Sequence, residues 1–312
     1  MAKLELYAPR RADDRRTWAW ASIPLVVVFV VAGALLSTTL GRFIGIMTPK
    51  GANPAYPHWL FSTYANLSYA FIAALIFLWV WWVERRGLDA IGLNGRFLVR
   101  YGRGLLLGAV MMGLLVASGY ALGGYGVVGE GLWRRPDASA LVPVVAMAAA
   151  FMVQGACEEI AFRGWQMQVL ASRWGVVWAV LINTGLFTWL HAGNIALSPE
   201  LGLGLVNIAL DTLFISLYAM KDGSIWGVCG QHFVWNWLMG AGFGLEVSGT
   251  KQGVAPLFAA LAPRAGAPWW LTGGAFGPEG TVMMTVIDVV CLAIVVGVFA
   301  ARPPRGHEAP AA

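Results

Sequence analysis

The chain has 312 residues, of which 58% are hydrophobic and only 12% are charged, and its mean hydropathy is +0.67. Soluble domains carry about 25% charged residues, so this composition excludes an ordinary water-soluble protein and predicts one embedded in lipid. The net charge of +5 does not indicate nucleic-acid binding, because the basic residues flank apolar segments and no nucleic-acid module surrounds them.

A membrane-spanning helix needs about 20 predominantly apolar residues. The segments that meet this requirement are, in chain order, 18–40, 60–83, 104–124, 141–161, 175–194, 201–220, 224–245 and 281–301. The first is too long for the apolar part of a signal peptide and no small-residue cleavage site follows it, so we expect it to be retained. The sequence therefore predicts an all-α, polytopic membrane helix bundle of about eight transmembrane helices, with its core in helices 4–7.

The basic residues are distributed unevenly between the two ends of these helices. The segments on the side of the membrane that holds the N-terminus contain Lys3, Arg10, Arg11, Arg15, Arg16, Arg85, Arg86, Arg96, Arg100, Arg103, Arg163, Arg173, Lys221, Arg302 and Arg305. On the other side lie Arg42, Lys50, Arg134, Arg135, Lys251 and Arg264. Because Lys and Arg favour the cytoplasmic side, both termini are predicted to be cytoplasmic.

The chain divides into six expected parts. These are a basic cytoplasmic tail (1–16), accessory transmembrane helices 1–3 (17–137), a core that holds the intramembrane charged and His residues (138–245), an external loop rich in Gly, Ala and Pro (246–280), helix 8 (281–301) and a cytoplasmic tail (302–312). The accessory helices are expected to be structural. The long loop is either a binding lid or an unstructured connection. Cys157, Cys229 and Cys291 lie in separate helices without a Cys-x-x-Cys pair, so neither a disulfide framework nor a thiolate zinc site is expected.

Charged residues are concentrated in the fourth predicted helix. Glu158, Glu159 and Arg163 lie within six residues, and each charge costs at least about 2.5 kcal/mol near the bilayer centre, so they mark a functional site. Glu159 and Arg163 are four residues apart and can pair on one helix face, whereas Glu158 points about 100° away. Glu158 is then left as a candidate base or metal ligand. The alternative is a structural ion pair with a second Glu facing the headgroups.

Two histidines lie in later predicted helices. His191 ends an apolar run, and a helical hairpin turning near residues 173–175 would place it level with Glu158, both about 25 Å from the turn. This hairpin predicts a cavity open to the cytoplasm. His232 is followed at i+4 by Asn236, whose amide could orient the imidazole or donate to a substrate carbonyl. Each of these polar residues could instead only hold helices together.

These motifs, Glu-Glu-x-x-x-Arg at 158–163, Phe-x-x-x-His at 187–191 and His-x-x-x-Asn at 232–236, occur in the order found in one protein family. Over roughly 141–245 the chain resembles the CPBP family of CAAX proteases and bacteriocin-processing enzymes, also called Abi. Residues 273–280 are similar to a segment of bacterial relatives. The resemblance implies an endopeptidase of the bacterial inner membrane that hydrolyses membrane-associated peptides, either lipidated or of the leader type.

Two mechanisms follow from the resemblance. In the first, Glu158 takes a proton from water positioned by His191, His232 and Asn236 stabilise the oxyanion, and Glu159 with Arg163 holds the geometry. In the second, Glu158, His191 and His232 bind Zn²⁺, which activates the water. The sequence lacks a Gly-x-Ser-x-Gly elbow, a His-Glu-x-x-His zinc motif and a Gly-x-Gly-Asp motif, so other intramembrane protease mechanisms lack their signatures.

Two other classes of function stay open. A non-catalytic scaffold or immunity protein of the same family would need no intact motif. A proton-coupled transporter is suggested by Asp211 and Asp288, because intramembrane carboxylates often mark ion pathways. Asp211 follows Asn207 by four residues on one helix face, so a helix-packing hydrogen bond is its structural interpretation.

Overall fold

The computed structural model describes residues 4–134, 136–301 and 307–308. Lys3, Arg135, Arg302 and Arg305, which contributed to the predicted orientation, lie outside the described residues. The helices are α1 (Ala19–Phe43), α2 (His58–Leu67), α3 (Ala70–Leu78), α4 (Phe97–Ala121), α5 (Ala138–Glu159), α6 (Met167–Trp174), α7 (Val176–Leu190), α8 (Pro199–Asp222), α9 (Trp226–Trp237), α10 (Trp269–Thr272) and α11 (Val282–Ala301). The strands are β1 (Leu4–Glu5), β2 (Met47–Thr48), β3 (Gly51–Ala52), β4 (Tyr125–Glu130), β5 (Ala259–Pro263) and β6 (His307–Glu308).

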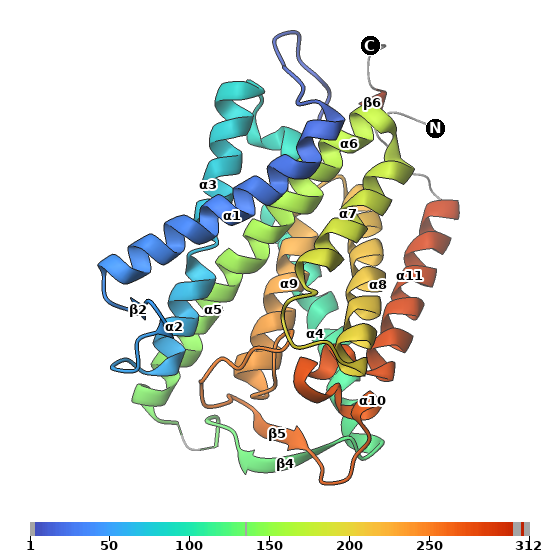
Figure 1. The fold of residues 1–312 in the computed structure, drawn as a ribbon. Helices are drawn as coiled ribbons and strands as arrows, with labels where there is room; N and C mark the ends of the chain where they lie inside the picture. Colours follow the sequence, from blue (N-terminus) through green and yellow to red (C-terminus); the bar gives the residue numbers. More distant parts are fainter. Residues whose placement is uncertain (1–3, 135, 302–306, 309–312) are drawn as a thin grey trace.

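The architecture is a helical bundle, as the sequence predicted (Figure 1). Among the described residues, six helical segments are long and apolar enough to cross a membrane: Ala19–Phe43, His58–Val83, Phe97–Ala121, Ala138–Trp174, Pro199–Asp222 and Val282–Ala301. The remaining two predicted spans are shorter helices, because α7 has 15 residues and α9 has 12 before a π-helical turn at Leu238–Gly242. The protein is therefore an integral, multi-pass membrane protein.

Two predicted helices have a different course in the structure. Residues 60–83 do not form one regular helix, because the α-helix is interrupted at Ser68 and Tyr69, between α2 and α3. The helix predicted at 141–161 instead continues from α5 through a π-helical turn at Ile160–Gln166 into α6, so that 138–174 form one long helical segment. Hydropathy detects the apolar length but neither the break nor the extra residue of a π turn.

The predicted hairpin is present. Gly175 separates α6 from α7 with φ of 92°, a left-handed value that favours glycine, and the chain reverses there. On the other side of the bundle, α9 packs closely between α4 and α5. A Cβ added at Gly104 of α4 would lie 1.8 Å from the carbonyl oxygen of Gly227, so the α4–α9 contact requires glycine. These two features fix the helices that carry Glu158, His191 and His232.

The N-terminal segment is folded against the hairpin. Leu6 and Tyr7 are buried, and the Tyr7 hydroxyl donates a hydrogen bond to the carbonyl oxygen of Arg163 at 2.7 Å. Glu84, just after the second span, is buried and accepts hydrogen bonds from Thr17 and Trp165. Burial raises the pKa of the Glu84 carboxyl, although these hydrogen bonds oppose the shift.

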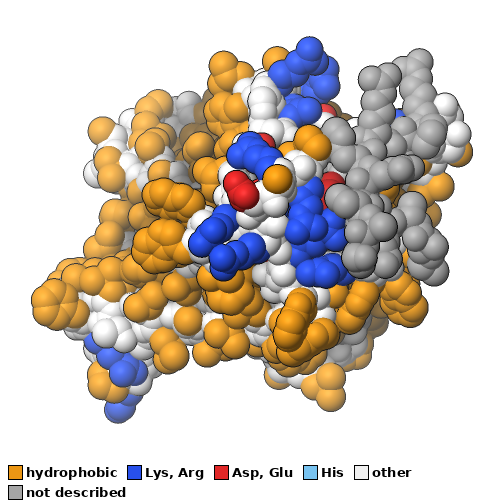
Figure 2. All heavy atoms as spheres, turned by 90° about the horizontal axis from the view of Figure 1, so that it is seen from above, with side chains coloured by type: hydrophobic (Ala, Val, Ile, Leu, Met, Phe, Trp, Pro, Cys, Tyr) orange, Lys and Arg blue, Asp and Glu red, His pale blue; other side chains and the backbone are white. Residues whose placement is uncertain are grey.

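The two ends of the chain lie on one side of the bundle, because β1 pairs with β6 in antiparallel fashion. Figure 2 views the molecule from this side and shows Lys and Arg side chains gathered in the middle of the face, with hydrophobic side chains around them. The β4–β5 pair and α10 lie at the opposite end (Figure 1). This charge asymmetry agrees with the expected topology; that the basic face is cytoplasmic stays a prediction.

Candidate active site

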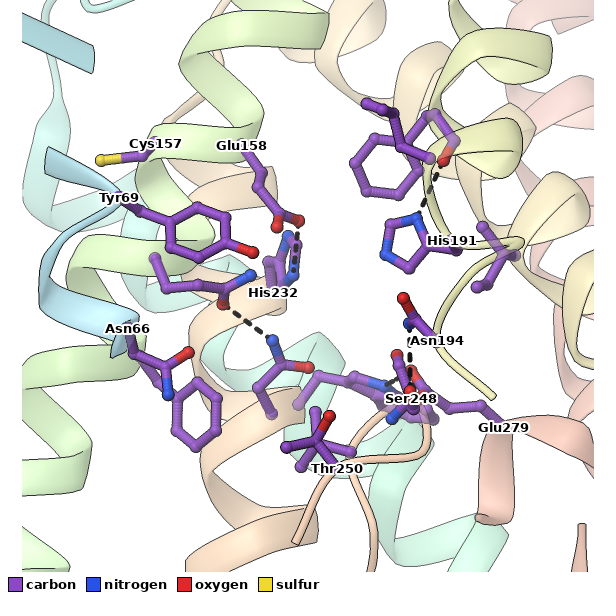
Figure 3. Close-up of a pocket in the computed structure, with 18 of the residues that line it drawn as sticks. Asn66, Tyr69, Cys157, Glu158, His191, Asn194, His232, Ser248, Thr250 and Glu279 are labelled. Carbon is purple, nitrogen blue, oxygen red and sulfur yellow. Dashed lines mark hydrogen bonds and ion pairs between the residues drawn. The ribbon is translucent and has the colours of Figure 1, made fainter. Parts of the chain in front are cut away.

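A cavity of about 400 Å³ lies inside the bundle and brings together the predicted site residues. Glu158, His191, His232 and Asn236 all line it, from α5, the end of α7 and α9 (Figure 3). Glu159 and Arg163 do not line it and lie behind the other residues, each with no exposed side-chain surface. All six predicted residues are therefore close together: four line the cavity, and two are buried behind the lining residues.

The Glu159–Arg163 ion pair forms as the i, i+4 spacing predicted. Arg163 Nη1 lies 3.2 Å from Glu159 Oε1, and Arg163 Nη2 donates to Thr212 Oγ1 at 3.2 Å. The guanidinium also lies 4.2 Å from the centre of the Phe187 ring, a favourable cation–π distance. This cation is thus held by α5, α7 and α8 at once, which fixes the position of the Glu159 carboxylate.

His232 lies between the two neighbouring carboxylates. Its Nδ1 is 2.9 Å from Glu159 Oε1, and its Nε2 is 3.7 Å from Glu158 Oε2. Gly155 makes room for the ring, since a Cβ there would be 3.2 Å from His232 Cγ. A carboxylate only accepts hydrogen bonds, so Nδ1 carries a proton and Nε2 is the nitrogen presented to Glu158 and the cavity.

His191 is anchored in a similar way from the opposite wall. Its Nδ1 lies 2.8 Å from the carbonyl oxygen of Phe187, which can only accept, so Nδ1 carries the proton here too. The ring lies 4.7 Å from the Phe187 ring, at the point where α7 ends. Figure 3 shows His191 facing Glu158 and His232 across the cavity. Water placed between them would meet a carboxylate and an imidazole nitrogen.

Asn236 has a different partner from the one that the sequence suggested. Its amide Nδ2 donates to Gln154 Oε1 at 3.0 Å, and the His232 imidazole is oriented by Glu159 instead. The physical reason is that a hydrogen bond to an ionised carboxylate is stronger than one to a neutral amide. The expectation that Asn236 orients His232 is therefore wrong, whereas a contact between Asn236 and substrate stays a prediction.

The three predicted metal ligands, Glu158, His191 and His232, do not converge on one point in this structure. Within the part of the chain that the structure describes, no three His, Cys, Asp or Glu side chains converge closely enough to hold a metal ion. Glu158 and His232 are neighbours, but His191 lies on the opposite wall. The trio Glu158, His191 and His232 does not fit a zinc ion as the side chains stand, and we derive no catalytic step through one.

The direction in which the cavity extends also differs from the expectation. Toward the hairpin turn the space is filled by buried side chains, including Trp165 and Gln166, which have no exposed surface. At the other end the cavity is lined by residues of the segment predicted to be an external loop, among them Ser248, Thr250 and Gln252. The cavity therefore extends from the middle of the bundle away from the basic face, and not toward it.

Sequence reasoning missed several residues that line the cavity. Asn66 and Tyr69 come from the region expected to be purely structural, and Gln154 lies one turn before Glu158. Polar side chains that interrupt the apolar run at 66–69 were the available signal. They could not be distinguished by sequence from residues that only join helices.

The helix-packing hydrogen bond expected of Asp211 is not seen among the described residues. Asn207 donates instead to the carbonyl oxygens of Glu279 and Thr281. Asp211 lines the cavity, and its Oδ1 is buried without a hydrogen-bond partner among the described residues. Asp288 on α11 is fully buried, and neither of its carboxyl oxygens has a hydrogen-bond partner within that same set of residues.

The fold and the site define a class of protein. A polytopic helical membrane protein that gathers two glutamates and two histidines around an internal cavity has the groups needed for hydrolysis inside a membrane. Residues 140–238 match the family model described as type II CAAX prenyl endopeptidase Rce1-like. The resemblance is thereby confirmed over this segment, where the match supports similarity to CPBP-family intramembrane proteases. Comparisons with curated proteins and with solved structures returned no match.

Proposed function

We propose that the protein is an intramembrane endopeptidase that hydrolyses membrane-associated peptides with water activated by Glu158 and His191. The observation that carries the proposal is the position of His232, 2.9 Å from Glu159 and 3.7 Å from Glu158, on the cavity wall that His191 faces. If His232 only held helices together, Glu159 would be a sufficient partner, and Glu158 would not need to point into the cavity. The family match supports proteolysis as the general reaction.

The proposed reaction begins with proton transfer. Glu158 accepts a proton from water while His191 Nε2 accepts a hydrogen bond from the same water, and the water oxygen attacks the peptide carbonyl carbon. As the tetrahedral intermediate collapses, the carbon–nitrogen bond breaks and the leaving amine takes the proton from Glu158. Glu159 and Arg163 keep His232 in place throughout, because their charges are buried and mutually paired.

The oxyanion of the intermediate forms on the α9 side of the cavity. Asn236 has a second amide N–H besides the one donated to Gln154, and this group can donate to the substrate carbonyl. His232 is the neighbouring group on the same helix, one turn earlier. In this proposal the pair supports the developing negative charge.

Zinc catalysis is the alternative for the same site. When bound, a zinc ion would supply water with a pKa lowered toward about 7. Binding by Glu158, His191 and His232 would require the side chains to come closer together than they are here. Metal analysis of the purified protein, with and without chelator treatment, therefore belongs in the test.

The proposed substrate is a peptide held at the bilayer, either lipidated or of the leader type. The cavity extends toward residues 247–252, so substrate enters from that end of the bundle. With both termini in the cytoplasm, as the basic face suggests, this is the external side of a bacterial inner membrane. The hairpin predicted a cavity open to the cytoplasm, which would place cleavage near the inner leaflet, but the cavity does not extend toward the hairpin turn.

The test uses the detergent-purified full chain and a library of fluorogenic lipidated and leader-type peptides. Wild type is expected to cleave a member of the library, and Glu158→Gln, His191→Ala and His232→Ala are each expected to abolish cleavage. Glu130→Gln is the control, because Glu130 lies on exposed strand β4 far from the cavity. Cleavage that survives Glu158→Gln would contradict the mechanism. A folded wild type that cleaves nothing would favour the non-catalytic scaffold, and proton flux in liposomes would favour a transporter.

A further inference from the structure

Tyr69 occupies an unusual position in the second membrane segment. It lies at the break between α2 and α3, where the regular helix is interrupted at Ser68 and Tyr69. The side chain lines the cavity, and Figure 3 shows its phenol directed toward Glu158 and His232. Glu158 is also the charged group that acts most strongly on this phenol. The hydroxyl is therefore placed beside the residues that activate water.

The Tyr69 hydroxyl differs from other buried tyrosine hydroxyls of the protein. Tyr7 donates to the carbonyl oxygen of Arg163, and Tyr125 donates to that of Thr272. Among the described residues Tyr69 Oη has no hydrogen-bond partner, and it is not one of the enclosed polar atoms without a partner. Its donor is thus directed into the cavity, where a substrate group can accept it.

The chemistry of the site requires such a donor. Ionised Glu158 only accepts hydrogen bonds, and the imidazole of His191 presents Nε2 to the cavity as an acceptor, because its Nδ1 carries the proton. These groups suit the attacking water. They do not suit the carbonyl oxygen, which becomes negatively charged in the transition state and requires donors placed in advance.

We propose that Tyr69 is a further catalytic residue, whose hydroxyl donates a hydrogen bond to the carbonyl oxygen of the scissile peptide bond. This inference rests on the proposed protease function. When water adds to the carbonyl carbon, its proton passes to Glu158 and the electron pair of the carbonyl bond moves onto the oxygen beside Tyr69. When the carbon–nitrogen bond breaks, the pair returns and Glu158 gives its proton to the amine. Tyr69 keeps its own proton in both steps.

A purely structural Tyr69 would act through its ring, which packs against the core. Tyr69→Phe keeps this ring and removes only the hydroxyl, so it separates the two roles. Tyr120→Phe is the matched control: Tyr120 is 49% exposed near the end of α4, and no hydrogen bond of its hydroxyl is seen among the described residues. Both variants are expected to unfold thermally as wild type does.

The decisive measurement is steady-state cleavage of the best peptide of the library. Loss of one oxyanion donor typically lowers kcat by about 100-fold, so Tyr69→Phe is expected to show a loss of that order with KM nearly unchanged. A phosphinate analogue of the cleaved bond, which imitates the tetrahedral oxyanion, should bind Tyr69→Phe more weakly by a similar factor.

Three results would overturn the proposal. One is an unchanged kcat in Tyr69→Phe, and another is a rise in KM alone, which would indicate ground-state packing. The third is equal binding of the phosphinate to wild type and Tyr69→Phe. If wild type itself cleaves no peptide, the proposed protease function fails first, which is distinguishable because Tyr69→Phe then has no activity to compare.

Discussion

The buried ion pair between Glu159 and Arg163 permits a quantitative prediction. With an effective dielectric constant of about 20, unit charges 3.2 Å apart attract each other by about 5 kcal/mol. Glu159→Gln removes one charge and leaves the Arg163 guanidinium, which has no exposed surface, without its carboxylate. Breaking a buried pair in this way typically costs about 3–5 kcal/mol. We expect Glu159→Gln to lower the free energy of unfolding by this amount.

The protein contains its own reporters of unfolding. Cys157 and Cys229 are buried free thiols, so a thiol-reactive fluorescent dye labels them only when the bundle opens. Cys291 is only partly buried, so the measurement is made in a Cys291→Ser background. At roughly 2–4 °C per kcal/mol, the expected fall in Tm is on the order of 10 °C.

The matched control is an ion pair with the same spacing on the surface. Arg134 Nη1 lies 3.4 Å from Glu130 Oε1, but both side chains are more than half exposed. Exposed pairs contribute about 0–1 kcal/mol, so Glu130→Gln should leave Tm almost unchanged. Arg163→Met combined with Glu159→Gln should cost less than the sum of the two single changes. If Glu159→Gln has the same Tm as Glu130→Gln, the buried pair does not support the site.

Three further predictions follow from other parts of the structure. Gly155→Val should displace His232 and reduce cleavage by about 100-fold or more, whereas Gly113→Val, which has open space around it, should be tolerated; equal activities would contradict this. Burial raises the pKa of the Glu84 carboxyl, so its contribution to stability is fully present below the ordinary pKa of a Glu side chain and is lost as pH rises above that value. Glu84→Gln should therefore gain Tm relative to wild type as the pH is raised above that value, and a Tm difference that does not change with pH would exclude this cause. Lys251→Cys, on a 78% exposed side chain, should react with membrane-impermeant maleimide added to intact cells, and labelling only after lysis would reverse the proposed topology.

The features that sequence predicted correctly depend on local patterns. Hydropathy located the helical segments because each is a continuous apolar run, and Gly175 ends α6 at the predicted turn. The Glu159–Arg163 pair followed from a spacing of four residues, which places both on one helix face. Such patterns need no knowledge of how the helices pack together.

The features that sequence did not predict depend on contacts between distant segments. The bond between His232 and Glu159 joins residues 73 positions apart, and no local pattern distinguishes it from a bond between His232 and Asn236. The same holds for Tyr69, which lines the cavity from the interruption between α2 and α3. Long-range packing decides which of several polar partners is chosen.

The segment 246–280, predicted to be an external loop, contributes residues to the lining of the candidate active-site cavity. The Glu279 carboxylate accepts hydrogen bonds from Trp235 Nε1 at 3.0 Å and from the backbone and hydroxyl of Ser248 at 2.7 Å each. Asn194, in the turn after His191, donates to the Ser248 carbonyl oxygen at 3.0 Å. One buried carboxylate thus joins this segment to the helix of His232, and Ser248 joins it to the turn that follows His191. Because the segment also lines the end of the cavity away from the basic face, a substrate that displaces it would act directly on the position of both imidazoles.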